Sequence, residues 1–195
     1  MFSIQSLRPN VSREEAIRQF SSRALGFLRD RFKGPLRSIA DFYIPFRIFE
    51  VEIVNSGKRD HRLIAIDAVV GSLDPYFFEK PPTPNLLIEV ETRNCLNASL
   101  QPDQAKHLMV TKVQRLLFTK GFFRMRNLAI SVSPLAGEIC IPYWVGFRGH
   151  GASASFDVID AVRRQPEGAR VRRLIHEWLT SQNPVSAEAP LPLSS

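Results

Sequence analysis

Cysteines and long apolar runs are scarce in this sequence. It holds 2 cysteines in 195 residues, too few for the disulfide framework of a secreted domain. The first ten residues contain no apolar run of the kind that a signal peptide needs. No stretch of the chain approaches the ~18 apolar residues of a membrane span. The sequence therefore predicts a cytoplasmic protein with two single, reduced thiols and no membrane contact.

Motifs for catalysis, metal binding and phosphate binding are also missing. The 4 histidines are scattered, without the short ligand spacing of metal sites. Gly149-His150-Gly151 is too short to cradle a phosphate. We therefore predict no catalytic residue, no metal and no cofactor. Two arrangements of distant residues stay open: a composite zinc site from Cys95, Cys140 and a histidine, or Cys140 with His150 as nucleophile and base.

Positive charge is in excess, with a net charge of +7. The surplus lies in residues 1–41 and 101–195, whereas residues 42–100 are slightly acidic. Five arginines gather near the start of the last predicted helix: Arg163, Arg164, Arg170, Arg172 and Arg173. This cluster predicts a basic surface for an anionic partner. The alternative is that the arginines only solvate the outer faces of helices.

Patterns of apolar residues predict three helices and several strands. Ser12 and Glu15 form a capping box that starts the first helix, and Gly34-Pro35 ends it. Apolar residues three and four apart predict a second helix over 102–120 and a last one from about Pro166. Segments rich in β-branched and aromatic residues predict strands over 42–54, 63–70, 86–91, 128–132, 138–147 and 155–162.

An internal repeat is the most informative pattern. Tyr43–Arg47 (YIPFR) resembles Cys140–Trp144 (CIPYW), and Ile66–Val69 (IDAV) recurs as Ile159–Val162. In both halves a helix with matching apolar positions comes first, which predicts a duplication. The predicted division is a first repeat (1–78), a linker with a short strand (79–101), a second repeat with the last helix (102–181) and a disordered tail (182–195).

Four residues mark equivalent positions of the repeats. Proline lacks an amide donor, so Pro45 and Pro142 are predicted at a strand start or on an unpaired edge. Asp67 and Asp160 end their strands, where a carboxylate accepts hydrogen bonds from turn amides. The alternative is that the two aspartates face each other as a carboxylate pair for acid–base or metal chemistry.

The predicted fold class is α+β. Two diverged helix–strand–strand repeats would form an antiparallel sheet packed by amphipathic helices, with a C-terminal helix added. A strand that ends in Asp-Ala, two residues and Gly (here Asp67–Gly71), after a hairpin partner and a helix, resembles the PepSY module. More loosely, it is similar to cystatin-like sheets that curve around a helix. The resemblance implies a non-catalytic module that binds other proteins.

The predicted function is therefore a non-enzymatic interaction or adaptor domain that binds a protein partner or a second copy of itself. Antiparallel edges and amphipathic helices are common docking surfaces, and no catalytic motif competes with this interpretation. Two alternatives remain open. One is a nucleic-acid-binding protein that uses its basic helix faces. The other is a small enzyme or ligand carrier with a pocket between the repeats.

Overall fold

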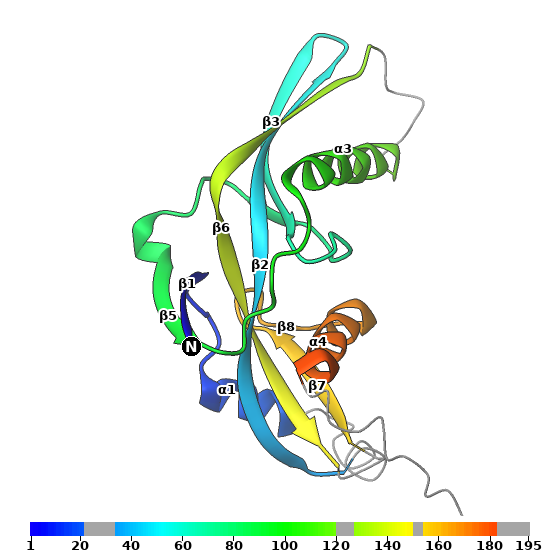
Figure 1. Cartoon of the computed structure of the whole chain (residues 1–195). Coiled ribbons are helices and arrows are strands. Elements are labelled where there is room, and N and C mark those ends of the chain that lie inside the picture. The colour runs from blue at the N-terminus through cyan, green and yellow to red at the C-terminus, as the bar shows by residue number, and fades with distance from the viewer. Residues whose placement is uncertain (22–33, 120–126, 150–153, 183–195) are drawn as a thin grey trace, which may run out of the picture.

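The computed structural model describes residues 1–21, 34–119, 127–149 and 154–182, and its class is α+β (Figure 1). Of the predicted tail (182–195), Gln182 is the last residue of a helix and 183–195 lie outside the described residues, as does the predicted first helix beyond Ser21. In chain order the elements are β1 (Phe2–Leu7), α1 (Arg13–Ser21), β2 (Leu36–Asn55), β3 (Lys58–Asp67), β4 (Tyr76–Phe78), the 3-10 turn η1 (Pro84–Leu86), β5 (Leu87–Thr92), α3 (Pro102–Thr119), β6 (Ala129–Arg148), β7 (Ser155–Asp160), β8 (Gln165–Pro166) and α4 (Ala169–Gln182).

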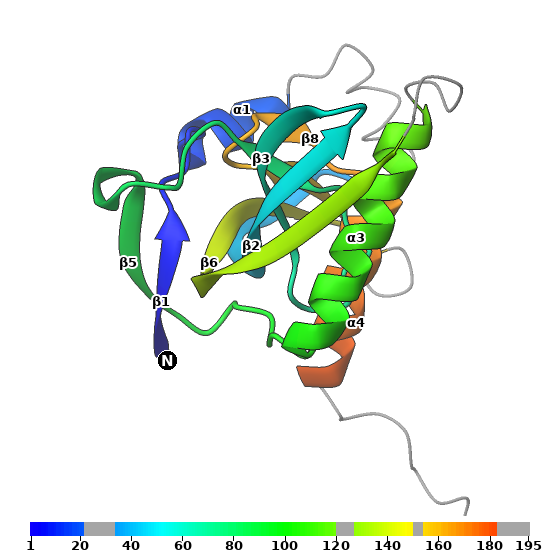
Figure 2. The same ribbon diagram turned by 90° about the horizontal axis from the view of Figure 1, so that it is seen from above.

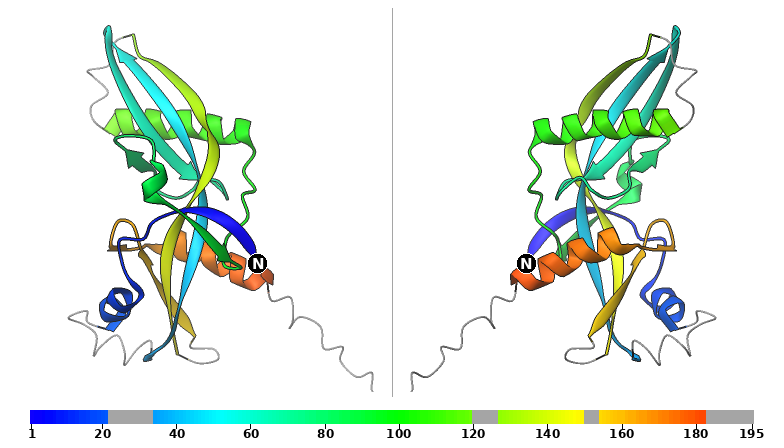
Figure 3. Two further views of the ribbon diagram at one scale, coloured as in Figure 1. Left: turned by 90° about the vertical axis from the view of Figure 1, so that its left-hand side faces the viewer. Right: turned by 90° about the vertical axis from the view of Figure 1, so that its right-hand side faces the viewer.

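Two strands of 20 residues, β2 and β6, form the centre of the molecule. They pair antiparallel along almost their whole length and make a twisted ribbon (Figure 3). β3 pairs with the second half of β2, and β7 pairs with the end of β6. The two halves of the chain therefore share one sheet. The sequence predicts two separate strands over 128–147, but β6 is continuous: β2 pairs with it on both sides of a register shift, where Arg47 faces Glu138 and Phe49 faces Pro134.

The sheet is mixed, whereas the sequence predicts an antiparallel one. β1, which no sequence signal indicated, pairs antiparallel with β5 but runs parallel to β6 where Ser6 faces Cys140. Seen from above, β1 and β5 lie on one side of the ribbon, and α3 and α4 lie on the other (Figure 2). The parallel contact arises because β1 reaches the middle of the ribbon from outside rather than through a hairpin.

Local sequence signals explain the tight connections. Ser56 and Gly57 both adopt positive φ, 52° and 79°, as a type I′ hairpin turn between β2 and β3 requires. The predicted capping box is present at α1, where the Ser12 amide donates to Glu15 and the Glu15 amide donates to Ser12 Oγ at 3.2 Å. Pro166 lies in β8 instead of starting the last helix, since it pairs with Ile159 and α4 begins only at Ala169.

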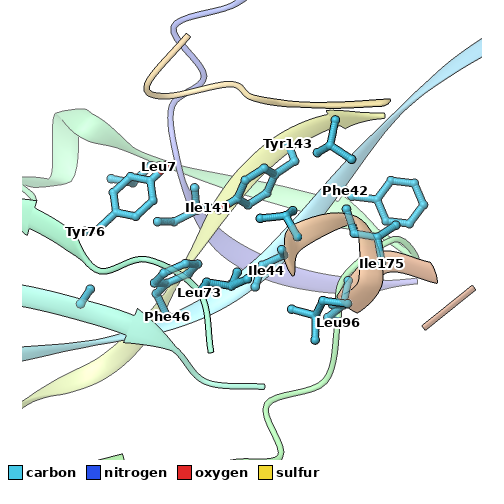
Figure 4. Packing of buried hydrophobic residues seen from close by; sticks show 14 of the residues in the cluster. Leu7, Phe42, Ile44, Phe46, Leu73, Tyr76, Leu96, Ile141, Tyr143 and Ile175 are labelled. Atoms are coloured by element: carbon cyan, nitrogen blue, oxygen red, sulfur yellow. The ribbon is translucent and has the colours of Figure 1, made fainter. Parts of the chain in front are cut away.

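Each helix buries one apolar face against the sheet. The largest core joins β2, β6 and α4, and Figure 4 shows Phe42, Ile44, Ile141, Tyr143 and Ile175 within it. α3 covers the end of the ribbon that carries β3, through Ala105, Met109 and Val113. α1 packs at the other end through Ala16 and Phe20, next to Ile159 and Ala161 of the β7 segment.

Pro45 and Pro142 lie in the middle of β2 and β6, both buried, and not at a strand start or a free edge as predicted. Proline has no amide hydrogen to donate, and the sheet tolerates this because the neighbouring strand ends at the proline: β3 ends beside Pro45, and β7 ends beside Pro142. The carbonyl of Pro45 accepts the amide of Ala68 at 2.7 Å, just past the end of β3. In the same way Pro142 accepts the amide of Ala161 at 3.0 Å, just past the end of β7.

Candidate functional site

The turn after β3 is built on the buried carboxylate of Asp67. Its Oδ1 accepts the amides of Val70 and Gly71 at 2.9 and 2.8 Å, and its Oδ2 accepts the amide of Leu73 at 2.8 Å. Gly71 has φ +68°, a backbone conformation that favours glycine. Asp67 thus accepts turn amides, as its position at the end of a strand predicts, and it serves to fix this turn.

The turn after β7 uses Asp160 in a related way. Asp160 Oδ1 accepts the amides of Val162 and Arg163 at 2.8 and 2.7 Å. Its Oδ2 accepts a hydrogen bond from the hydroxyl of Tyr76, which comes from β4 in the other half of the chain. Burial raises the pKa of Asp160 and also the pKa of nearby Glu167. The hydrogen bonds described for Asp67 all come from its own turn, and those described for Asp160 come from its own turn and from Tyr76.

All five predicted basic residues make contacts within the protein, and three of them make close contacts with turns or segments away from their own element. The guanidinium of Arg163 lies 3.4 Å from the ring centroid of Tyr76, a cation–π contact, and donates to the carbonyl of Pro75 at 2.7 Å. Arg164 Nε donates to the carbonyl of Asn10 at 2.9 Å, and Arg170 pairs with Asp74 at 2.9 Å. These three arginines tie turns and helices together, and Arg164 and Arg170 still keep 60% and 64% of their side chains exposed. The prediction of one basic surface built from all five arginines stays a prediction.

The other two, Arg172 and Arg173, line a cavity of about 950 Å³. The cavity, named here the basic cavity, lies between α4, the paired ends of β6 and β7, and the start of β2. It brings together residues from these four segments: Arg37, Ser38, Phe147, Arg148, Gly149, Ala154, Ser155, Phe156, Arg172, Arg173, His176, Leu179 and Thr180. Four of these residues are arginines and one is a histidine, whereas none is acidic.

Arg148 supports the inner wall of the basic cavity. Only 2% of its surface is exposed, and its Nε lies 3.3 Å from Asp157 Oδ2. Its two Nη atoms donate to the carbonyls of Phe20 (2.6 Å) and Gly34 (3.2 Å). A buried arginine with this many acceptors is held in one orientation, so Arg148 positions the wall. Arg172 reaches the same carboxylate more loosely, with 3.9 Å between Nη1 and Asp157 Oδ1.

The floor of the basic cavity is aromatic, and two polar atoms lie buried near it. Phe147 and Phe156 pack with ring centroids 5.9 Å apart, and Phe42 continues the stack toward Trp178. Within the described part of the chain, Ser155 Oγ, on the cavity wall, and Trp178 Nε1, deeper in the core, have no hydrogen-bond partner. Sequence reasoning found Arg172 and Arg173 but missed Arg37, which lies far away in the chain. The spacing of Arg172 and His176, one helical turn apart, was an available signal.

The two cysteines come together at the middle of the ribbon. Cys95 and Cys140 are both buried, and their Sγ atoms are 3.8 Å apart. Their shared hydrogen bond lowers the pKa of Cys95, while that bond and burial raise the pKa of Cys140. Among the described residues no three His, Cys, Asp or Glu side chains gather as metal ligands would. His150, the predicted base for Cys140, lies outside those residues.

No described helix is long and apolar enough to cross a membrane. Comparison with family models, with curated proteins and with solved structures found no match to this chain. The resemblance to PepSY modules therefore stays a prediction, and any functional assignment depends on the geometry of the chain itself.

Proposed function

We propose that this chain is a non-enzymatic binding domain whose basic cavity takes a small organic anion. The observation that carries this proposal is the lining of the cavity, in which four arginines and His176 surround a floor of Phe147 and Phe156. A volume of about 950 Å³ lies within the range of small-molecule sites.

The chemistry of the lining favours a carboxylate or phosphate attached to an apolar or aromatic body. Arginine presents a planar fork of donors that matches both anions. Arg172 and Arg173 keep 40% and 69% of their side chains exposed, and their ion pairs with Asp157 (3.9 Å) and Glu177 (3.8 Å) are long, so an anionic ligand can compete for both guanidinium groups. The rings of Phe147 and Phe156 offer an apolar wall for the rest of it.

Calorimetry with matched probes tests the proposal. The full chain should bind 4-phenylbutyrate and should bind 4-phenylbutanol, its neutral analogue, at least ~10-fold more weakly, because a charge-assisted hydrogen bond is worth ~1.5–3 kcal/mol. Arg172→Gln and Arg173→Gln should each weaken binding of the anion by about 10-fold. Arg170→Gln is the matched control on the same helix, since Arg170 pairs with Asp74 and does not line the cavity. Equal binding of acid and alcohol would contradict the proposal.

We also propose that the scaffold arose by duplication. Besides the proline carbonyls, Ala161 accepts the amide of Val11 (3.0 Å) and Ala68 accepts the amide of Leu100 (2.9 Å), both just before a helix. The side chains of Trp144 and Arg47 donate to these same two residues, Val11 and Leu100. Such reciprocal contacts support two copies related by a two-fold axis. In an alignment of relatives, equivalent positions of the halves should be more alike than positions shifted by one residue.

A protein partner or a second copy is the second candidate, favoured by the exposed edge of β4. Among the described strands, β3 is the one neighbour of this short strand, and Phe77 on it is 52% exposed. A hollow of about 660 Å³ beside it is lined partly by Phe78, Pro81 and Leu135. Apolar side chains on a free strand edge are typical of docking surfaces.

The oligomeric state tests this second candidate. Mass measurement in solution should find a complex that Phe77→Ser disrupts, whereas Val70→Ser, which changes another exposed apolar residue, should leave it intact. A monomer at all concentrations, with no protein captured from the host, would count against it.

Nucleic-acid binding has less support, because Arg163, Arg164 and Arg170 already make contacts within the protein. A gel shift on RNA and DNA at low salt would reveal it.

A further inference from the structure

The fold brings Cys95 and Cys140 together from distant segments of the chain, and neither residue lines the basic cavity. Cys95 lies beside Tyr43 of β2 in an isolated parallel bridge. Cys140 lies opposite Pro45 on the other side of the same strand. Their side chains meet in a small cluster with Tyr43, where the Sγ atoms are 3.8 Å apart.

We propose that Cys95 and Cys140 are a modification site, which forms a reversible intramolecular disulfide by exchange with a low-molecular-weight disulfide. A disulfide bond measures ~2.05 Å and joins Cα atoms usually ~4.4–6.8 Å apart. The sulfurs therefore have to close their present 3.8 Å separation. Because β2 lies between the segment of Cys95 and β6, that segment also has to move toward β6 for the bond to form. Both thiols are already directed at each other and share a hydrogen bond.

The exchange proceeds in two steps with a defined order. Cys95, whose pKa is lowered by its hydrogen bond with Cys140, attacks one sulfur of the small disulfide as a thiolate. The S–S bond of the reagent breaks, one small thiolate leaves, and Cys95 carries the other half as a mixed disulfide. Cys140 then loses its proton to solvent and attacks Cys95 Sγ. The second small thiolate leaves, both small thiolates take up protons, and the two electrons lost by the protein dithiol reside in two small thiols.

Access to the pair is controlled by β1 and β5. Each thiol is 6% exposed, and Ile4 of β1 and Val90 of β5 pack over the cluster. A reagent reaches Cys95 only when these two strands open locally. We therefore expect oxidation to be slow in the native protein. The resulting disulfide would fasten the segment that contains Cys95 directly to β6 across the middle of the ribbon.

The test exposes the full reduced chain to glutathione disulfide under native conditions and follows it by intact mass and by thiol alkylation. The expected product has lost two hydrogens and both free thiols, stays monomeric in mass, regains both thiols with dithiothreitol, and yields a digest peptide that links Cys95 to Cys140. Cys140→Ser should stop at the mixed disulfide and gain one glutathionyl group on Cys95.

Two outcomes would overturn the proposal. One is a protein that keeps both thiols in its native state until denaturant is added, even over days. The other is a product linked only between chains or carrying a glutathione on each cysteine. Because these measurements use the unaltered chain, they decide the matter even if a cysteine variant fails to fold. Wild-type protein oxidised in the native state should also show a higher Tm than reduced protein, whereas a strained, misplaced bond would lower it.

Discussion

The turn after β3 and the turn after β7 both begin with a buried aspartate, but only the second aspartate also accepts a hydrogen bond from a distant side chain. Asp67 is satisfied entirely by amides of its own turn. Asp160 accepts two turn amides and the Tyr76 hydroxyl. The first turn is therefore locally complete, whereas the second is also a joint between the two halves of the chain.

The same contrast holds for the positive-φ residue of each turn. Gly71 has φ +68° in the first turn and Arg164 has φ +60° in the second. The left-handed conformation costs ~1–2 kcal/mol for a residue with a Cβ. Arg164 adopts this conformation despite its cost, and its side chain donates a hydrogen bond to the carbonyl of Asn10. One turn uses a residue suited to the backbone, and the other accepts backbone strain for a tertiary contact.

Replacement of the aspartates should give the largest effects. Asp67→Ala leaves three amide donors without an acceptor, and we expect the free energy of unfolding to fall by about 3–5 kcal/mol. Asp160→Ala should cost less, about 2–3 kcal/mol, because two turn amides lose their acceptor there and not three. Urea unfolding measures both. Asp74→Ala, which removes an exposed aspartate, should change stability by less than ~0.5 kcal/mol. A larger loss for Asp160→Ala than for Asp67→Ala would invalidate the comparison.

Substitutions at the positive-φ positions should have intermediate effects. Gly71→Ala adds a Cβ that would lie 2.8 Å from Leu108 Cδ1. Together with the backbone strain, we expect this contact to lower the free energy of unfolding by about 2–3 kcal/mol.

At position 164, the Ala and Gly variants both lack the arginine contacts, so the difference between their free energies of unfolding isolates the effect of the backbone. Arg164→Gly should be more stable than Arg164→Ala by about 1 kcal/mol. Thermal or urea unfolding measures all three variants, and equal stability of the pair at 164 would show that the turn carries no strain.

Sequence reasoning succeeded where the cause of a structure is local. The capping box at Ser12 and Glu15 and the turn-capping aspartates are fixed by residues a few positions apart. Pro45 and Pro142 were misplaced at strand edges because their tolerance depends on where β3 and β7 leave the sheet, which the local sequence does not encode.

The candidate sites were harder to predict because distant segments build them. The basic cavity combines Arg37 from β2, Phe147 from β6 and Arg172 from α4, and no spacing rule connects these residues. Five clustered arginines suggested one basic surface, but three of them face acceptors elsewhere in the chain. The contact between Cys95 and Cys140 depends on long-range pairing, because Cys95 lies beside Tyr43 on one side of β2 and Cys140 lies opposite Pro45 on the other. Tyr76 was likewise missed, since its role as a partner of Asp160 exists only in the folded chain.

The smallest expected effect is a difference in pH dependence that comes from Asp160. Burial raises the pKa of this carboxyl above its ordinary value of 3.8, so over the range just above that value the folded state binds more protons than the unfolded state. Stability from this group is therefore full below pH 3.8 and declines as pH rises through the folded-state pKa. Asp160→Asn keeps a neutral acceptor and removes the titration.

Urea unfolding of wild type and Asp160→Asn from about pH 4 to pH 7 measures this effect. The stability of wild type relative to the variant should fall as pH rises, because the charged carboxylate is less well solvated in the turn than in the unfolded chain. If wild type instead gained stability over the variant on going to neutral pH, the turn amides and Arg163 would outweigh desolvation. Asp160 would then be stabilised as a carboxylate by its own turn, and the contrast between the two turns would reduce to the contact with Tyr76.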